Sequence, residues 1–111
     1  LLICFDVEHD APLQSLAARG AQAVMVPTAN MAGFDDVQHI RLPDAALRSG
    51  LAIAYANACG QEGGTVYNGL STAVGGDGSR IAEAGRAPCL LDAALRPLNA
   101  PPSTPPARTR A

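Results

Sequence analysis

Short apolar runs alternate along this chain with polar stretches that contain glycine or proline, and this pattern predicts a mixture of strands and helices. The opening run Leu1–Phe5 is apolar and gives way to Asp6, Glu8 and His9. This is typical of a buried strand that reaches a polar sheet edge. Residues 23–26 and 51–56 are two further apolar runs, and each is predicted to be a strand. The 23–26 run lacks alternation, which favours a strand covered on both faces.

Two helices are predicted between these strands. The first spans residues 12–19, because Pro12 suits a first helical turn, Asp10 is a candidate N-cap and Gly20 is a candidate stop. The second begins at Pro43 and ends before Gly50, after a loop over residues 30–37. The order of strands and helices indicates an α/β fold.

The C-terminal part of the chain carries a turn signal and then a change of composition. Residues 65–74 and 79–84 flank Gly75-Gly76-Asp77-Gly78, which predicts a hairpin because these residue types tolerate positive φ. Six of the nine prolines fall within residues 88–111. We therefore divide the chain into a domain portion, 1–87, and a proline-rich, largely disordered tail, 88–111. Residues 90–95 are expected to hold a short strand or a helical turn.

Charge and composition narrow the class of function. A net charge of -2 leaves no basic footprint for nucleic acid and no polybasic patch for a membrane surface. The apolar runs are far shorter than the ~20 residues that span a bilayer, so the cytoplasm is the expected location. The three cysteines form no C-x-x-C pair, and an odd number favours reduced thiols over a disulfide framework.

Cys4 is the candidate for chemistry because it lies where the first apolar run becomes polar. A thiol at the carboxyl end of a strand acts as a nucleophile when its surroundings lower its pKa. The alternative is a small buried hydrophobe, since free cysteine is among the most buried residue types. Cys4 by itself does not decide between the two.

Several segments in order resemble the carbon-nitrogen hydrolase (nitrilase/amidase) superfamily over about residues 1–85. The family has an I-C-Y-D-x-E-type segment around its nucleophile and a V-P-T-A-N-M segment after the next helix. The matching segments of this chain are Ile3-Cys4-Phe5-Asp6-Val7-Glu8, Val26-Pro27-Thr28-Ala29-Asn30-Met31, Ala54-Tyr55-Ala56-Asn57 and Tyr67-Asn68-Gly69-Leu70-Ser71. No single segment is specific, but their order and spacing together are.

The resemblance implies a fold and a reaction. The fold would be part of a four-layer αββα sandwich, incomplete at its N-terminus, with Cys4 on a central strand between the 24–26 and 53–55 strands. The reaction would be hydrolysis of a non-peptide C–N bond in a small amide or nitrile through a cysteine acyl-enzyme. Cys4 would be the nucleophile, and the backbone N–H of Phe5 would stabilise the oxyanion. No cofactor is expected, and the full-length form is expected to be a homo-oligomer.

The family works with a Glu-Lys-Cys triad, and this chain lacks two of its members. It contains no lysine, and only three residues precede Cys4. We therefore expect the glutamate and the lysine to lie outside this chain, which would be the C-terminal portion of a longer domain. Alone, it is expected to be inactive.

Glu8, Thr28 and Asn30 are the candidate substrate-binding residues. By the family's logic, a glutamate where other members have arginine would favour a substrate with a cationic amine. Glu8 is equally well interpreted as a carboxylate at a helix N-terminus, and Thr28 and Asn30 as loop residues that cap the backbone. No metal site is expected from His9 and His39, which are predicted to be surface histidines.

Two alternatives to a hydrolase remain. The first is a diverged, inactive remnant that acts as a structural or interaction module, because His9-Asp10-Ala11 stands where the family usually has Phe-Pro-Glu. The second is an unrelated small thiol-dependent α/β protein.

Overall fold

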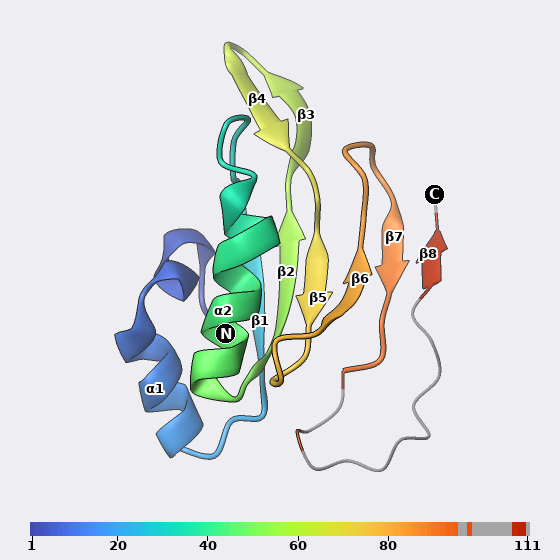
Figure 1. Ribbon diagram of the computed structural model, residues 1–111. Coiled ribbons are helices and arrows are strands. Elements are labelled where there is room, and N and C mark those ends of the chain that lie inside the picture. The colour runs from blue at the N-terminus through green and yellow to red at the C-terminus, as the bar shows by residue number, and fades with distance from the viewer. Residues whose placement is uncertain (96–97, 99–107, 111) are drawn as a thin grey trace.

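A four-stranded sheet forms the centre of the fold, and helices cover one of its faces (Figure 1). The computed structural model describes residues 1–95, 98 and 108–110. The sheet has the order β1-β2-β5-β6, with bounds Ala23–Thr28, Ala52–Asn57, Thr72–Val74 and Arg80–Glu83. β1 and β2 are parallel, whereas the β2–β5 and β5–β6 pairs are antiparallel. The predicted strands at 23–26 and 51–56 are therefore confirmed.

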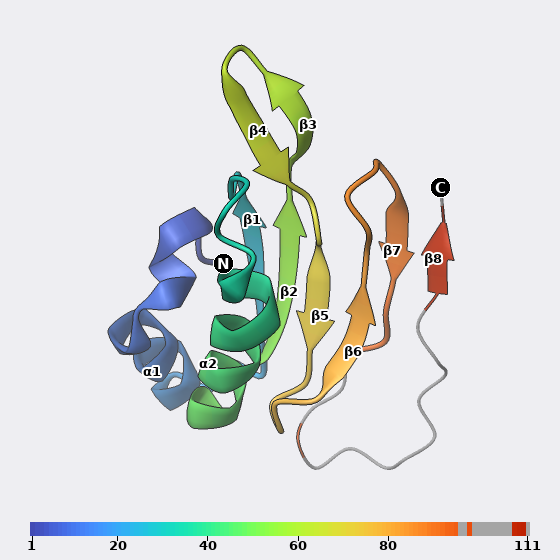
Figure 2. The same ribbon diagram turned by 45° about the horizontal axis from the view of Figure 1, so that its top comes forward.

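The helical elements lie together on one side of this sheet (Figure 2). They are η1 (Cys4–Glu8), α1 (Asp10–Ala18), η2 (Val37–Arg41) and α2 (Leu42–Ser49). α1 buries Leu13, and α2 buries Leu42, Ala45 and Ala46, at the spacing that puts residues on one helix face. None of the helices in the described part of the chain is long and apolar enough to cross a membrane.

The core forms where these helix faces meet the sheet. Leu13 and Leu42 pack in one buried cluster with Val24, Val26 and Ile53, each no more than 1% exposed. Burying one such side chain contributes about 1.5–3 kcal/mol. This cluster fixes the position of the helices, and with them the segments that precede and follow each helix.

Within the described part of this chain, only one of the two faces of β1 is covered. Its burial alternates, with Val24 and Val26 buried and Ala23, Met25 and Pro27 exposed. Met25 is 46% exposed, because the described helices pack on the opposite face only.

The first eight residues also differ from the prediction. Residues 4–8 form the 3₁₀ helix η1 and not the end of a strand, because Cys4 adopts the left-handed φ of 53°. Leu2 donates its backbone N–H to the carbonyl of Met25 at 3.1 Å, so the opening residues lie along β1. β1 and β2 pair directly. The expected strand between them therefore does not exist, and Cys4 approaches the sheet from the other edge of β1.

Both predicted helices exist, with changes at their starts. Asp10 is the first residue of α1, and His9 is the N-cap without a side-chain cap bond, so the predicted N-cap was wrong. The carboxylate of Asp10 instead pairs with Arg48 of α2 at 3.0 Å. The helical run before Gly50 begins with η2 at Val37, six residues earlier than Pro43, which lies in the first turn of α2.

The predicted hairpin around residues 75–78 is confirmed, but its first strand is split. β5 and β6 flank the turn, where Gly78 has φ 80° and Asp77 accepts a hydrogen bond from the backbone of Ser79 at 3.0 Å. Residues 65–74 are interrupted by left-handed conformations at Gly69 and Leu70. The part before this break, β4 (Thr65–Asn68), pairs with β3 (Cys59–Glu62) in a second hairpin that extends beyond the main sheet (Figure 1).

A short strand within residues 90–95 is confirmed as β7 (Leu90–Asp92). It pairs with β8 (Arg108–Arg110), so disorder does not extend through 108–110. The rest of the expected disordered tail, 96–97, 99–107 and 111, lies outside the described residues. The division into 1–87 and 88–111 stays a prediction.

Neighbouring residues on β1 test which face of the sheet is buried. Replacing Val24 with alanine should lower the free energy of unfolding by about 2 kcal/mol, because two methyl groups are lost from the core. Met25→Ala should change it by less than about 0.5 kcal/mol, because that side chain is half exposed. Urea denaturation measures both. Equal losses would show that the second face is also covered.

Candidate functional site

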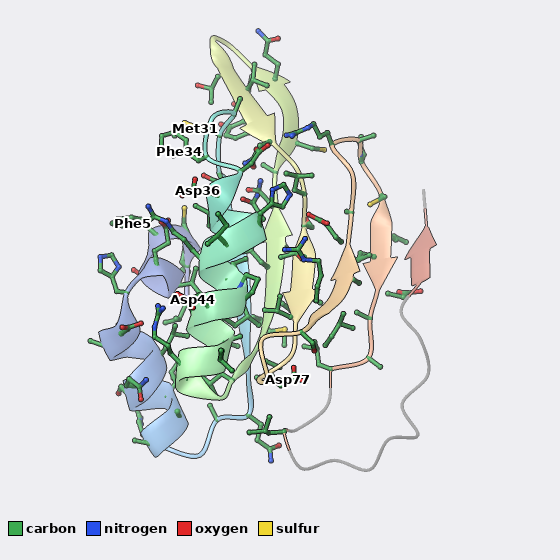
Figure 3. The ribbon with its side chains drawn as sticks, in the orientation of Figure 1. Phe5, Met31, Phe34, Asp36, Asp44 and Asp77 are labelled. Atoms are coloured by element: carbon green, nitrogen blue, oxygen red, sulfur yellow. The ribbon has the colours of Figure 1, made fainter. Side chains whose placement is uncertain are left out.

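A cavity of about 330 Å³ opens beside the carboxyl end of β1. Its walls come from η1, from the segment that joins β1 to η2, and from η2 itself. The lining residues are Cys4, Phe5, Glu8, Thr28, Ala29, Asn30, Met31, Phe34, Asp36, Val37, Arg41 and Tyr55. Every residue predicted to act in the site is among them. Figure 3 labels four of the lining residues, Phe5, Met31, Phe34 and Asp36, on the same side of the molecule.

Cys4 is held in a strained turn at this cavity. Its φ of 53° is unusual for a residue with a side chain. The turn is closed on both sides, because Ile3 donates its backbone N–H to Asp6 Oδ2 at 3.3 Å and Asp6 donates its own to the carbonyl of Ile3 at 3.1 Å. Strain of this kind costs about 1–3 kcal/mol and persists where surrounding structure enforces it. Here it turns a half-buried thiol toward the cavity.

The surroundings of the thiol favour its charged form. Hydrogen bonds from the backbone of Ala29, the hydroxyl of Thr28 and the backbone of Phe5 together lower the pKa of Cys4, against the effects of burial and of the nearby Glu8 carboxylate. A thiolate accepts such bonds more strongly than a thiol does. The site therefore raises the fraction of the nucleophilic form at neutral pH.

Thr28 connects Cys4 to a buried phenol. Its hydroxyl lies 3.3 Å from the hydroxyl of Tyr55, which comes from β2 and is 3% exposed. Burial raises the pKa of Tyr55, and the hydrogen bond to Thr28 opposes that rise. The Thr28 hydroxyl thus lies within hydrogen-bond reach of both the Cys4 thiol and the buried phenol.

Glu8 is already paired. Its Oε1 accepts from Arg41 at 3.2 Å, and Arg41 also donates to Asp36 Oδ2 at 3.1 Å. The Glu8 side chain is 15% exposed and that of Arg41 is 57% exposed, so the pair lies at the rim with the carboxylate inside. Arg41 therefore screens the charge that would attract a cationic amine.

Asn30 lines the cavity, but its amide nitrogen is committed elsewhere. It donates to the carbonyl of Phe34 and to Gln38 Oε1, both at 3.0 Å. The interpretation of Asn30 as a residue that caps the local backbone thus has direct support in these contacts.

The sequence did not single out several members of the site. Met31 and Tyr55 lie inside the quoted motifs, which is the signal that could have marked them. Phe34 and Arg41 carried no such signal, because Phe34 reaches the cavity from the loop before η2 and Arg41 from the end of η2. Phe5, Met31 and Phe34 are 61%, 44% and 51% exposed and form an apolar rim.

The two histidines are exposed, as predicted, and lie outside the lining of the cavity. His39 contacts Glu83 at 3.0 Å, and a ring nitrogen of His9 lies 3.1 Å from the carbonyl of Phe5. Among the described residues, no group of three or more histidine, cysteine, aspartate or glutamate side chains could hold a metal ion.

Comparison with known proteins extends the resemblance seen in the sequence. No family model matches the chain. A curated protein of Pseudomonas protegens, named "Hydrolase in pqqF 5'region", is 43% identical over 94 residues, which are 85% of this chain and 31% of that protein. A glutamine-dependent NAD(+) synthetase of Xylella fastidiosa is 34% identical over 82 residues, 70% of this chain and 15% of that enzyme. The chain thus spans about a third or less of the length of these relatives.

The fold leads to the same group of proteins. A solved mutant of an amidase of the nitrilase superfamily from Nesterenkonia AN1 matches with a TM-score of 0.75 and 44% identity, over 78% of this chain and 34% of that one. A second mutant of that amidase, described as carrying the acetamide moiety of fluoroacetamide on its active site cysteine, matches with a TM-score of 0.73 and 45% identity, over 77% and 33%.

These likenesses cover most of the chain, and they confirm the predicted nitrilase-like α/β fold class. On sequence and on fold together, the chain belongs to the carbon-nitrogen hydrolase (nitrilase) superfamily.

Proposed function

We propose that this chain supplies the nucleophile and part of the substrate pocket of an amidase-type carbon-nitrogen hydrolase, which cleaves small amides through a cysteine acyl-enzyme. The observation that carries the proposal is the strained Cys4, whose lowered pKa coincides with a cavity of substrate size. The related amidase with an acetamide moiety on its cysteine supports it.

The proposed reaction starts with attack of the Cys4 thiolate on the carbonyl carbon of the amide. A C–S bond forms and the carbonyl oxygen takes the negative charge, which the backbone N–H of Phe5 would stabilise. The C–N bond then breaks, the amine leaves with a proton, and water releases the acyl group from sulfur. A nitrile would enter by the same attack on its carbon.

The proton transfers need a base and a second oxyanion donor from outside this chain. In the family these are a glutamate and a lysine, and this chain contains no lysine. Loss of one oxyanion donor costs about 10²–10³ in rate. We therefore propose that the isolated chain binds small amides and can be modified at Cys4, but does not catalyse their hydrolysis. Homo-oligomerisation of the complete enzyme remains part of the proposal.

The rim suggests a neutral substrate more than a cationic one. Phe5, Met31 and Phe34 present apolar surface, and Arg41 pairs with the Glu8 carboxylate. An amine-bearing substrate would have to displace Arg41 from Glu8. The alternative function, an inactive structural module, is favoured by the replacement of Phe-Pro-Glu with His9-Asp10-Ala11.

Site-selective alkylation tests the nucleophile. Under limiting iodoacetamide, Cys4 should be labelled before Cys89, although Cys89 is exposed and Cys4 is half buried. The reason is the lowered pKa of Cys4, which provides thiolate where exposure alone would favour Cys89. Peptide mass spectrometry measures the order. The urea-denatured chain is the control, in which the preference should vanish, and faster labelling of Cys89 in the folded chain would contradict the proposal.

A pH profile tests the hydrogen bond from Thr28. In a Cys59→Ser/Cys89→Ser background, Thr28→Val removes one bond that lowers the pKa of Cys4, so that pKa should rise. The midpoint of the alkylation rate should therefore move to higher pH, and the rate at pH 7 should fall. Thr65→Val makes the same change on the β3–β4 hairpin and should leave the profile where it was. An unmoved midpoint in Thr28→Val would contradict the proposed activation.

The charge of the reagent tests the Glu8–Arg41 pair. Arg41→Gln should expose the Glu8 carboxylate, and modification of Cys4 by a trimethylammonium-ethyl methanethiosulfonate should speed up about threefold to tenfold relative to the neutral methyl reagent at low salt. Arg48→Gln is the matched control, because Arg48 pairs with Asp10 and Asp44 away from this cavity. An unchanged ratio in Arg41→Gln would mean that Glu8 has no influence on substrate charge.

A further inference from the structure

A cluster of three side-chain amides lies directly behind the wall of the cavity that residues 29–36 form. Gln38 comes from η2, Asn57 from the end of β2 and Asn68 from the end of β4. Gln38 is 0% exposed and Asn68 is 1% exposed. Buried polar groups are tolerated only when they are hydrogen-bonded, so these bonds define the arrangement.

Asn68 is the centre of the cluster. Its Oδ1 accepts from Asn57 Nδ2 at 2.6 Å and from Gln38 Nε2 at 3.0 Å. The same two nitrogens donate to the carbonyl of Gly69, at 2.7 and 3.1 Å. The Nδ2 of Asn68 donates to Asp35 Oδ1 at 3.0 Å, so each of its amide atoms has a partner.

The side-chain oxygens of Asn57 and Gln38 accept hydrogen bonds from the cavity wall. Asn57 Oδ1 accepts the backbone N–H of Asn30 at 2.7 Å, and Gln38 Oε1 accepts Asn30 Nδ2 at 3.0 Å. Asn30 Nδ2 also donates to the carbonyl of Phe34. The cluster thereby connects β2 and β4 to Asn30 and Phe34, two of the residues that line the cavity on that side.

The backbone beside the cluster adopts a left-handed conformation at two consecutive residues. Gly69 has φ 61°, and a Cβ there would lie 2.9 Å from the Cα of Arg86. The next residue, Leu70, also has a left-handed φ of 56°. In the described chain, Leu70 and Cys4 are the two residues other than glycine with positive φ. Two consecutive left-handed residues place the Gly69 carbonyl where both amides reach it, and such strain concentrates at functional sites.

From this arrangement we infer that Asn68 is a positioning residue for amide recognition, which acts through Asn57 and Gln38 on the wall formed by Asn30 and Phe34. The inference rests on the proposed function. Amides have directional donors and acceptors, so the cluster specifies one position of the wall, which an apolar cluster of equal volume would not do. At the end of the cluster away from the cavity, Asp35 Oδ2 accepts a hydrogen bond from Arg86 Nη2 at 2.6 Å.

The test separates recognition of an amide from reactivity of the thiol. In the Cys59→Ser/Cys89→Ser background, the rate of Cys4 alkylation is measured against iodoacetamide concentration, which yields a saturation constant and a limiting rate. Methyl methanethiosulfonate, which carries no amide, reports the intrinsic reactivity of the thiol. In Asn68→Ala the efficiency with iodoacetamide should fall about tenfold, mainly through the saturation constant, because a displacement near 1 Å is enough for such losses.

With methyl methanethiosulfonate the same variant should stay within about twofold of the parent, since Asn68 does not touch the thiol. Ser49→Ala is the matched control: its hydroxyl bonds to the carbonyl of Ala45 at 2.8 Å, at the far end of α2. This substitution also removes a polar group and lowers stability. The ratio of the Cys4 modification rates with the two reagents should nevertheless stay the same.

Exchanging the amide and the carboxylate between positions 68 and 35 should restore the preference for iodoacetamide. Asn68→Asp keeps the oxygens that accept from Asn57 and Gln38 but places a carboxylate against that of Asp35, so it should lose the preference for iodoacetamide. Adding Asp35→Asn restores a donor opposite a carboxylate and should recover most of it.

Two failures are distinguishable. If the parent shows no saturation and the same ratio of the two reagents as free cysteine, the amide pocket and the proposed function are both wrong. If the parent shows saturation and Asn68→Ala keeps it unchanged, the positioning role alone is overturned.

Discussion

The parallel pairing of β1 with β2 is the constraint on which the rest of this structure depends. It sets Thr28 opposite Asn57 in register, at the same edge of the sheet. On one side of this edge, Thr28 hydrogen-bonds to the thiol of Cys4. On the other side, Asn57 belongs to the cluster of three side-chain amides. Parallel strands bring their carboxyl ends together, and ligand sites gather there for that reason. The buried cluster of Val24, Val26 and Ile53 under the helices keeps this register in place, since a slip by one residue would expose it.

The electrostatics of the cavity follow from a division between its floor and its rim. At the floor, backbone and hydroxyl donors surround Cys4 and favour the thiolate without adding a full positive charge. At the rim, Arg41 pairs with the Glu8 carboxylate, whose charge would otherwise act against the thiolate. Partly exposed ion pairs contribute only about 0–1 kcal/mol to stability. The more important effect of this pair is therefore on the net charge inside the cavity and near the Cys4 thiol.

In the described part of the chain, the two residues other than glycine with a positive φ, Cys4 and Leu70, both bear on the same cavity. Cys4 begins the turn of η1 that lines the cavity, and Leu70 follows the glycine whose carbonyl accepts hydrogen bonds from two side-chain amides behind the wall. Neither conformation is favourable by itself, at about 1–3 kcal/mol each. Each is maintained by a dense set of hydrogen bonds, through Asp6 at the first and through Asn57 and Gln38 at the second.

By itself, the sequence determined the elements whose signals are local. Pro12 and Gly20, Pro43 and Gly50, and the glycine-rich turn at 75–78 marked two helices and a hairpin, because caps and turns depend on the φ preferences of a few neighbouring residues. The ordered motifs led to the family and singled out Cys4. Tertiary structure decided everything that joins distant residues. Arg41 meets Glu8 across 33 positions, and Asn68 meets Asp35 across 33. Likewise, only the packing of helices on one face showed that β1 alternates and that Cys4 begins a 3₁₀ turn. No local preference encodes such contacts, since they exist only once the sheet register and the helix packing have brought the partners together.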